Sequence, residues 1–209
     1  MKILFLGDSI TDAGRDRRNY YHMGNGYPKY ASIELKKAFP QLNLNFINLG
    51  ISGNRTDQLF DRLYTDAIAF DPEIVSILIG INDVWHRHGS SRIETTDIQI
   101  ETNYRAILTR LCTQTNAKIV ILAPFLLDDE GKEAWREEVE KVICIVRRLA
   151  EKYADVYIPL DQYFAKALES QPSPKFYSDD GVHPNQNGSK FIGNLYSEAV
   201  SSLIKMLPE

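Results

Sequence analysis

Three residue types that could carry out acyl transfer stand at opposite ends of this chain. Ser9 follows the first apolar run, within Gly-Asp-Ser-Ile at 7–10, whereas Asp180 and His183 lie close to the other end. A serine hydroxyl, an imidazole base and a carboxylate that orients the imidazole form the minimum set for a serine nucleophile. The two segments therefore predict acyl-transfer chemistry, provided that the fold brings them together.

Each of these residues also has a purely structural interpretation. A serine between a strand and a helix often caps the helix or forms a turn, and Asp8 beside it is an equally good cap. An Asp three residues before a His is a common pair. Here, however, Gly181 and Pro184 favour a one-turn loop in which the carboxylate reaches Nδ1 of the imidazole. Position alone does not decide between these interpretations.

Two further segments follow apolar runs, Gly-Ile-Ser-Gly-Asn at 50–54 and Gly-Ile-Asn-Asp at 80–83. The backbone N–H of Gly53 has no side chain in front of it, and the Asn82 amide offers a second N–H. Together with the N–H of Ser9 these groups are the donor set of an oxyanion hole. A turn glycine and a turn asparagine are the alternative interpretations.

The Gly-x-Ser-x-Gly signature of the α/β-hydrolase fold is absent, because the residue after Gly53 is Asn54. Ser52 is therefore interpreted as a turn residue and not as a rival nucleophile. This disfavours the α/β-hydrolase fold.

The elements that must position these residues follow an alternating pattern. Short β-rich runs, each followed by turn residues and a longer helical pattern, lie at Ile3–Leu6, Leu44–Leu49, Ile74–Ile79, Lys118–Ala123 and Val156–Pro159. Such alternation is typical of βαβ units, and runs that are apolar throughout indicate strands covered on both faces. The sequence predicts an α/β fold, a three-layer α/β/α sandwich around a five-stranded parallel sheet.

The helical patterns between these runs are predicted at Tyr27–Phe39, Thr56–Ala69, Ile98–Gln114, Lys132–Tyr153 and Asn187–Met206. In the fourth, apolar residues between Val139 and Ala150 recur at three- and four-residue steps, which gives one core-facing stripe. The segments 13–26, 85–97 and 170–184 are predicted to be long loops. Loops at the carboxyl ends of parallel strands line the ligand crevice, so we expect these segments around the site.

Composition limits the class of protein. The 209 residues, 44% hydrophobic and 25% charged, fit a single domain over 1–209. The formal net charge of −4 argues against nucleic-acid binding. No window reaches the roughly 18 apolar residues of a membrane span, and the run after Lys2 is too short for a signal-peptide core. Cys112 and Cys144 are predicted to be free, buried thiols, which fits a cytoplasmic location.

Two motifs that resemble cofactor sites are weak. Gly24-Asn25-Gly26 lacks the third glycine and the preceding strand of a dinucleotide fingerprint. His86 and His88 offer two nitrogens to a metal, but no nearby Cys or acidic set completes a site. The sequence predicts no cofactor and no metal.

Taken in chain order, Gly-Asp-Ser-Ile, Gly-Ile-Ser-Gly-Asn, Gly-Ile-Asn-Asp and Asp-Gly-Val-His-Pro resemble the four sequence blocks of the SGNH hydrolases, also called GDSL-type esterases. The resemblance spans residues 7–184. It implies a flavodoxin-like fold, the catalytic residues Ser9, Asp180 and His183, and an oxyanion hole at Ser9, Gly53 and Asn82. The longer strings at 7–12 and 80–85 look most like bacterial acetylxylan-esterase-type carbohydrate deacetylases.

The resemblance therefore implies a serine esterase whose substrate is a small acylated molecule, in particular an acetylated xylo-oligosaccharide or related sugar. Polar and aromatic residues around the loops are candidates for contacting such a sugar, namely Asp8, Tyr20, Tyr27, Trp85 and His86. A lysophospholipase or thioesterase on the same fold, and a flavodoxin-like domain that binds without catalysis, are the alternatives. The tyrosine-rich loop from Asn19 is also compatible with an interface in a homo-oligomer.

Overall fold

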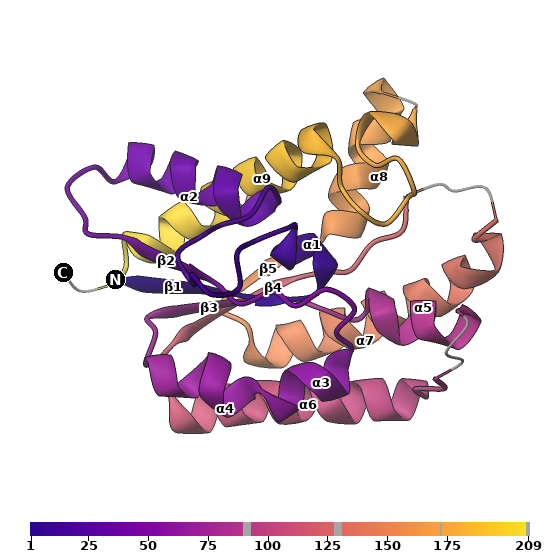
Figure 1. Cartoon of the computed structure of the whole chain (residues 1–209), viewed down its shortest axis with the longest axis horizontal. Helices are drawn as coiled ribbons and strands as arrows, with labels where there is room; N and C mark the ends of the chain where they lie inside the picture. Colours follow the sequence, from indigo (N-terminus) through magenta and orange to yellow (C-terminus); the bar gives the residue numbers. More distant parts are fainter. Residues whose placement is uncertain (90–92, 128–130, 172, 208–209) are drawn as a thin grey trace.

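Continuous apolar runs form the centre of the computed structural model, which describes residues 1–89, 93–127, 131–171 and 173–207. The runs become a five-stranded parallel sheet in the order β2-β1-β3-β4-β5 (Figure 1). The strands are β1 (Lys2–Gly7), β2 (Asn45–Asn48), β3 (Ile74–Leu78), β4 (Lys118–Leu122) and β5 (Val156–Ile158). All five strand predictions are confirmed, and each predicted end agrees within one residue.

Helices cover both faces of this sheet (Figure 1). On one face α2 (Tyr27–Ala38) packs against α9 (Gln186–Ile204), with α8 (Leu160–Ser170) beside them. The other face carries α3 (Thr56–Asp61), α4 (Leu63–Asp66), α6 (Asp97–Gln114) and α7 (Arg136–Tyr153). The short elements are α1 (Ser9–Asp12), α5 (Ile81–His88), η1 (Ile68–Phe70), η2 (Glu133–Trp135) and η3 (Pro174–Phe176). The predicted three-layer α/β/α architecture is confirmed.

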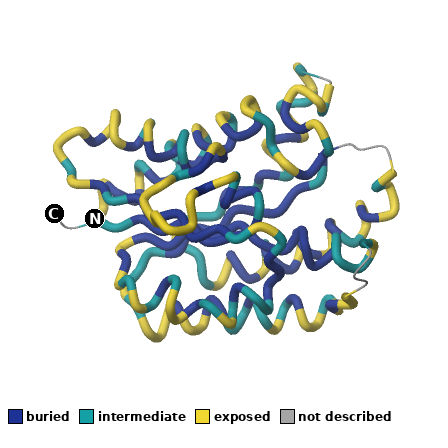
Figure 2. Tube along the Cα trace, viewed as in Figure 1, coloured by how far each residue is buried: buried dark blue, intermediate teal, exposed yellow. Residues whose placement is uncertain are grey.

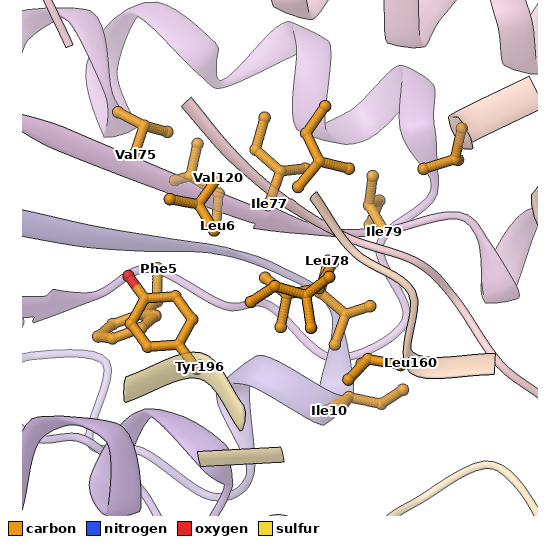
Figure 3. Close-up of a cluster of buried hydrophobic side chains, with 14 of the residues drawn as sticks. Phe5, Leu6, Ile10, Val75, Ile77, Leu78, Ile79, Val120, Leu160 and Tyr196 are labelled. Atoms are coloured by element: carbon orange, nitrogen blue, oxygen red, sulfur yellow. The ribbon is translucent and has the colours of Figure 1, made fainter. Parts of the chain in front are cut away.

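Alternating side chains of the strands fill two hydrophobic layers. Figure 3 shows Leu6 and Ile77 on one side of the sheet and Phe5 on the other, beside Tyr196 of α9. The rings of Phe5 and Tyr196 have centroids 5.2 Å apart. Burying a side chain of this size contributes about 1.5–3 kcal/mol. Exposed residues follow the outer sides of the helices (Figure 2), so the sheet is held between two amphipathic helix layers.

The helical predictions differ from the structure in several places. Two helices, α1 (Ser9–Asp12) and α8 (Leu160–Ser170), were not predicted. The span Thr56–Ala69 is divided into α3, α4 and η1, because Arg62 (φ −96°, ψ 3°) and Ala67 (φ −132°, ψ −60°) leave helical geometry. In the span Lys132–Tyr153 the α-helix begins only at Arg136, after η2. Trp85 lies in the helix α5 and not in a loop. Ile81 and Val84 form the buried face of this helix, but eight residues are too few to show a helical period in the sequence.

The cysteine prediction is half wrong. Cys112 and Cys144 are free, but both are exposed. Each stands next to the buried stripe of its helix, beside Leu111 in α6 and Ile143 in α7, and so faces outward. Within the described ranges, no helix combines the length and the apolar content that crossing a bilayer requires.

Candidate active site

The predicted site residues lie at the point where the strand order reverses. Strand β1 is flanked by β2 and β3, so the chain leaves it in one direction first and in the other later. Parallel α/β sheets bind ligands outside the carboxyl ends of the strands at such a point. Ser9 follows β1, Gly53 follows β2 and Asn82 follows β3. In Figure 1 α1 lies toward the end of the sheet opposite to the chain termini.

Ser9 is the first residue of α1, and a neighbour caps that helix in its place. Oδ1 of Asp8 accepts a hydrogen bond from the N–H of Ile10 at 2.9 Å, which makes Asp8 the N-cap. The turn requires Gly7, because a Cβ there would lie 2.3 Å from Oγ1 of Thr11 and 2.4 Å from the Leu78 carbonyl oxygen. The Ser9 hydroxyl is therefore not committed to capping.

The Ser9 hydroxyl contacts a histidine from the far end of the sequence. Its Oγ lies 2.9 Å from Nε2 of His183. On the other side of the ring, Nδ1 lies 2.6 Å from Oδ2 of Asp180. The second oxygen of Asp180 accepts from the N–H groups of Val182 at 2.9 Å and His183 at 2.7 Å. Serine, imidazole and carboxylate thus form one continuous chain of contacts, with the geometry that a serine nucleophile and its base require.

The carboxyl of Asp180 is an anion at neutral pH. Its partial burial raises the pKa, but the hydrogen bonds from the His183 ring and from two backbone N–H groups outweigh this and lower the pKa to about 2. A permanent negative charge at this position favours the imidazolium that forms when His183 takes up a proton.

Gly53 and Asn82 follow strand ends on the same side of the sheet as Ser9. Gly53 has φ +84°, in the left-handed region that favours glycine, and a Cβ built there meets nothing within 4 Å. Nδ2 of Asn82 donates to the Asn54 carbonyl at 3.1 Å. An amide NH₂ carries two N–H groups, so this bond fixes the Asn82 amide and leaves one N–H for a further acceptor.

Two buried carboxyl groups, those of Asp8 and Asp83, belong to the residues next to Ser9 and Asn82 in the sequence. Burial raises the pKa of Asp8 to about 7, opposed by the Ile10 N–H and by His183 and reinforced by Asp83. Burial also raises the pKa of Asp83 to about 6, opposed by its hydrogen bonds from Thr56. The Asp8 side chain is inaccessible, so its predicted contact with substrate is not supported.

Of the remaining residues that were predicted to contact substrate, one is buried, one lies away from Ser9, and two lie in α5. Tyr27 is buried in the core, where its ring packs edge-on against Phe5, and it is therefore closed to a ligand. The exposed Tyr20 packs against Phe70 at 5.7 Å, and Phe70 precedes the amino end of β3, away from Ser9. Trp85 lies next to the site, with its ring 5.6 Å from the His183 ring. His86 follows it and is partly exposed.

Sequence reasoning missed two neighbours of Trp85. The ring of Trp135 lies 5.0 Å from that of Trp85. Nζ of Lys132 donates to the Asp180 carbonyl oxygen at 2.9 Å and lies 5.7 Å from the Trp85 ring centroid. No local pattern signals these contacts, because both residues come from the segment between β4 and α7. His88 of α5 bonds to Glu138, and among the described residues no His, Cys, Asp or Glu group is arranged to hold a metal.

The sequence profile of the GDSL-like Lipase/Acylhydrolase family matches residues 5–191. The chain belongs to this family, whose members are also known as SGNH hydrolases, and it is a carboxylic ester hydrolase.

Individual relatives agree with this assignment. An acetylxylan esterase of Geobacillus stearothermophilus is 30% identical over 202 residues, which cover 93% of this chain and 91% of the relative. The crystal structure of an acetylxylan esterase from that organism superposes with a TM-score of 0.86 at 28% identity, over 95% of this chain and 93% of the other. The thioesterase 1/protease 1/lysophospholipase L1 of Escherichia coli K12 is 26% identical, over 97% of this chain and 84% of the relative.

Proposed function

We propose that this enzyme hydrolyses short acyl esters, acetyl esters in particular, through a covalent intermediate on Ser9. The observation that carries the proposal is the unbroken contact chain from Oγ of Ser9 through His183 to Asp180. Nε2 of His183 takes the Ser9 proton as Oγ attacks the ester carbonyl. Asp180 holds the ring and balances the charge of the imidazolium.

The negative oxygen of the tetrahedral intermediate then accepts hydrogen bonds from the N–H groups of Ser9 and Gly53 and from the Asn82 amide. As the intermediate collapses, the imidazolium returns its proton to the departing alcohol oxygen and the acyl group stays on Oγ. A water molecule, deprotonated by His183, repeats the attack and releases the acid and free Ser9.

For the alcohol we propose an acetylated xylo-oligosaccharide or a related sugar. Two observations support this choice: the similarity to an acetylxylan esterase, and the partly exposed Trp85 beside His183. An indole face next to the reacting centre suits a sugar ring, which stacks its C–H face on aromatic side chains. His86, on the same helix, is a candidate for contacting the sugar hydroxyls.

The second candidate is a thioesterase or lysophospholipase activity, favoured by the similarity to the E. coli enzyme of that description. The two candidates differ in what the site must hold, since a long acyl chain needs an apolar channel and an acetyl group does not.

A panel of three substrates separates them: acetylated xylo-oligosaccharides, p-nitrophenyl octanoate and octanoyl-coenzyme A. The proposal predicts the highest kcat/KM for the acetylated oligosaccharide. Replacement of Trp85 by Ala is expected to raise KM for the oligosaccharide while leaving hydrolysis of p-nitrophenyl acetate nearly unchanged. Preference for either octanoyl substrate overturns the deacetylase assignment and leaves the esterase chemistry intact.

A further inference from the structure

One arginine contacts the backbone segments that lead to two donors of the proposed oxyanion hole, Ser9 and Gly53, and the side chain of Asn54, whose carbonyl binds the third donor, Asn82. Arg62 lies between α3 and α4, and only 13% of its side chain is exposed. Nη2 donates to the Gly7 carbonyl at 2.9 Å and Nη1 to the Leu49 carbonyl at 2.6 Å. Nε donates to Oδ1 of Asn54 at 2.8 Å. A single guanidinium thus joins the carboxyl ends of β1 and β2 to the loop that follows β2.

Each acceptor has a direct relation to a donor. Gly7 ends β1 just before Ser9. Leu49 begins the segment that leads to Gly53, and Asn54 follows that glycine. The carbonyl of Asn54 is also the group that accepts from the Asn82 amide.

From these contacts we infer that Arg62 is a positioning residue, which holds the N–H groups of Ser9 and Gly53 and the Asn82 amide in one arrangement for the transition-state oxyanion. The inference rests on the proposed function, because it assumes that these groups bind an oxyanion. Arg62 itself does not touch the reacting atoms.

The arginine fork is essential to this role. Three acceptors lie around one planar guanidinium, and Asp66 balances its charge through Nη1 at 2.6 Å. A lysine carries a point charge and three donors on one atom, so it cannot span acceptors from three segments at once. A small shift of the oxyanion donors affects the transition state more than the bound ester, because the oxyanion exists only in the transition state and the intermediate.

The test compares Arg62→Lys with Arg87→Lys on p-nitrophenyl acetate. Arg87 is a matched control, 17% exposed, with three partners in Thr95, Asp97 and Glu138, none of which joins the oxyanion donors. Both variants are expected to lose similar stability. Arg62→Lys is expected to lower kcat about 10- to 100-fold with KM nearly unchanged, whereas Arg87→Lys keeps kcat within about 2-fold.

A second comparison separates positioning from general loosening of the fold. In an Asn82→Ala background one of the three positioned donors is already missing, whereas the N–H groups of Ser9 and Gly53 still depend on Arg62, so Arg62→Lys is expected to cost less than in the wild-type background, about 3- to 10-fold. Asn54→Ala removes only the side-chain acceptor of Arg62 and keeps the carbonyl that binds Asn82. It is expected to lower kcat about 3- to 10-fold, and this serves as the test should Arg62→Lys not fold.

Equal kcat for the wild type and the folded Arg62→Lys protein would overturn the inference, as would the same fold-loss in both Asn82 backgrounds. Unchanged kcat in Asn54→Ala would do so if Arg62→Lys is unfolded. Failure of the proposed function would give a different result. Either the wild-type protein would lack turnover, or the Ser9→Ala variant would keep it.

Discussion

The two halves of the candidate site are built in different ways. Ser9, Gly53 and Asn82 form one half, at the carboxyl ends of β1, β2 and β3. Next to Ser9 and Asn82 in the sequence, the side chains of Asp8 and Asp83 are fully buried. The other half is a surface loop in which the side chains of His183 and Asp180 are 44% and 40% exposed. Hydrogen bonds within the loop stabilise it. Ser178 donates to the His183 carbonyl at 2.7 Å, and Asp180 accepts hydrogen bonds from two backbone N–H groups of its own turn.

The difference indicates how each half fixes its geometry. The half that contains the proposed oxyanion hole depends on long-range contacts between strand ends, so the fold as a whole fixes the positions of Ser9, Gly53 and Asn82. The histidine half depends on hydrogen bonds within a few residues, with further support from the Leu127 N–H, which donates to the Gly181 carbonyl at 2.8 Å. We therefore expect replacement of the His183 side chain to reduce turnover with little loss of stability, and replacement of the buried Asp8 to change stability.

The largest effect is expected for His183→Ala. Loss of the base leaves Ser9 as an ordinary alcohol, and kcat for p-nitrophenyl acetate should fall about 10⁵- to 10⁶-fold. The melting temperature should stay within a few degrees because the side chain is half exposed. His22→Ala, at an exposed loop histidine that accepts from the Asp16 N–H, is the control and should keep full activity. A large drop in melting temperature for His183→Ala would contradict the expectation that this loop keeps its structure without the His183 side chain.

Asp180→Asn should reduce kcat about 10³- to 10⁴-fold, since an amide neither favours the imidazolium nor fixes the ring tautomer.

The lowered pKa of Asp180 also makes the stability of the protein depend on pH. The carboxylate's contribution to stability is present above its unfolded pKa of about 4 and is lost as pH falls toward 2. Thermal unfolding between pH 2 and 5 should show this loss in the wild type. Asp161→Asn, at a carboxylate paired with Arg147, is the control for turnover.

Asn82→Ala should lower kcat about 100- to 1,000-fold with KM nearly unchanged, as expected when one donor to an oxyanion is removed. Steady-state kinetics with p-nitrophenyl acetate measures both constants. An increase in KM with kcat unchanged would mean that the amide binds the ground state and is not an oxyanion donor.

The smallest effect concerns the buried carboxyl behind Ser9. Because burial raises the pKa of Asp8 to about 7, its contribution to stability is complete below pH 4 and is lost as pH rises through 7. Asn caps helices as well as Asp does and carries no charge to bury. Asp8→Asn should therefore gain about 1–3 kcal/mol relative to the wild type between pH 5 and pH 8, measured by urea unfolding. A pH-independent difference would argue against a buried titrating group.

The strands were predictable because β1, β3 and β4 consist mainly of apolar residues, a pattern that can be recognised without knowledge of the fold. The contact between Ser9 and His183, 174 positions apart, was predictable only because both residues belong to short motifs with a known order. Buried aromatic residues show the limit of such reasoning. Tyr27 follows a glycine-rich loop and was predicted to contact substrate, whereas the packing of α2 on β1 places its ring in the core.

Contacts that depend on several loops were not predictable. Trp135 and Lys132 lie about fifty residues after Trp85 in the sequence, and only the tertiary fold brings them next to its ring. Arg62 likewise occupies an ordinary position in a helical pattern, and its importance arises from strand-end carbonyls that no sequence period encodes.

In the proposed mechanism Ser9 forms the covalent intermediate. Reaction with a fluorophosphonate, which phosphonylates activated serines, followed by intact-protein and peptide mass spectrometry tests this role. We expect one adduct per chain, on the peptide that contains Ser9, and no adduct with the folded Ser9→Ala protein. An adduct on Ser52, or unchanged labelling and ester turnover in Ser9→Ala, would contradict it.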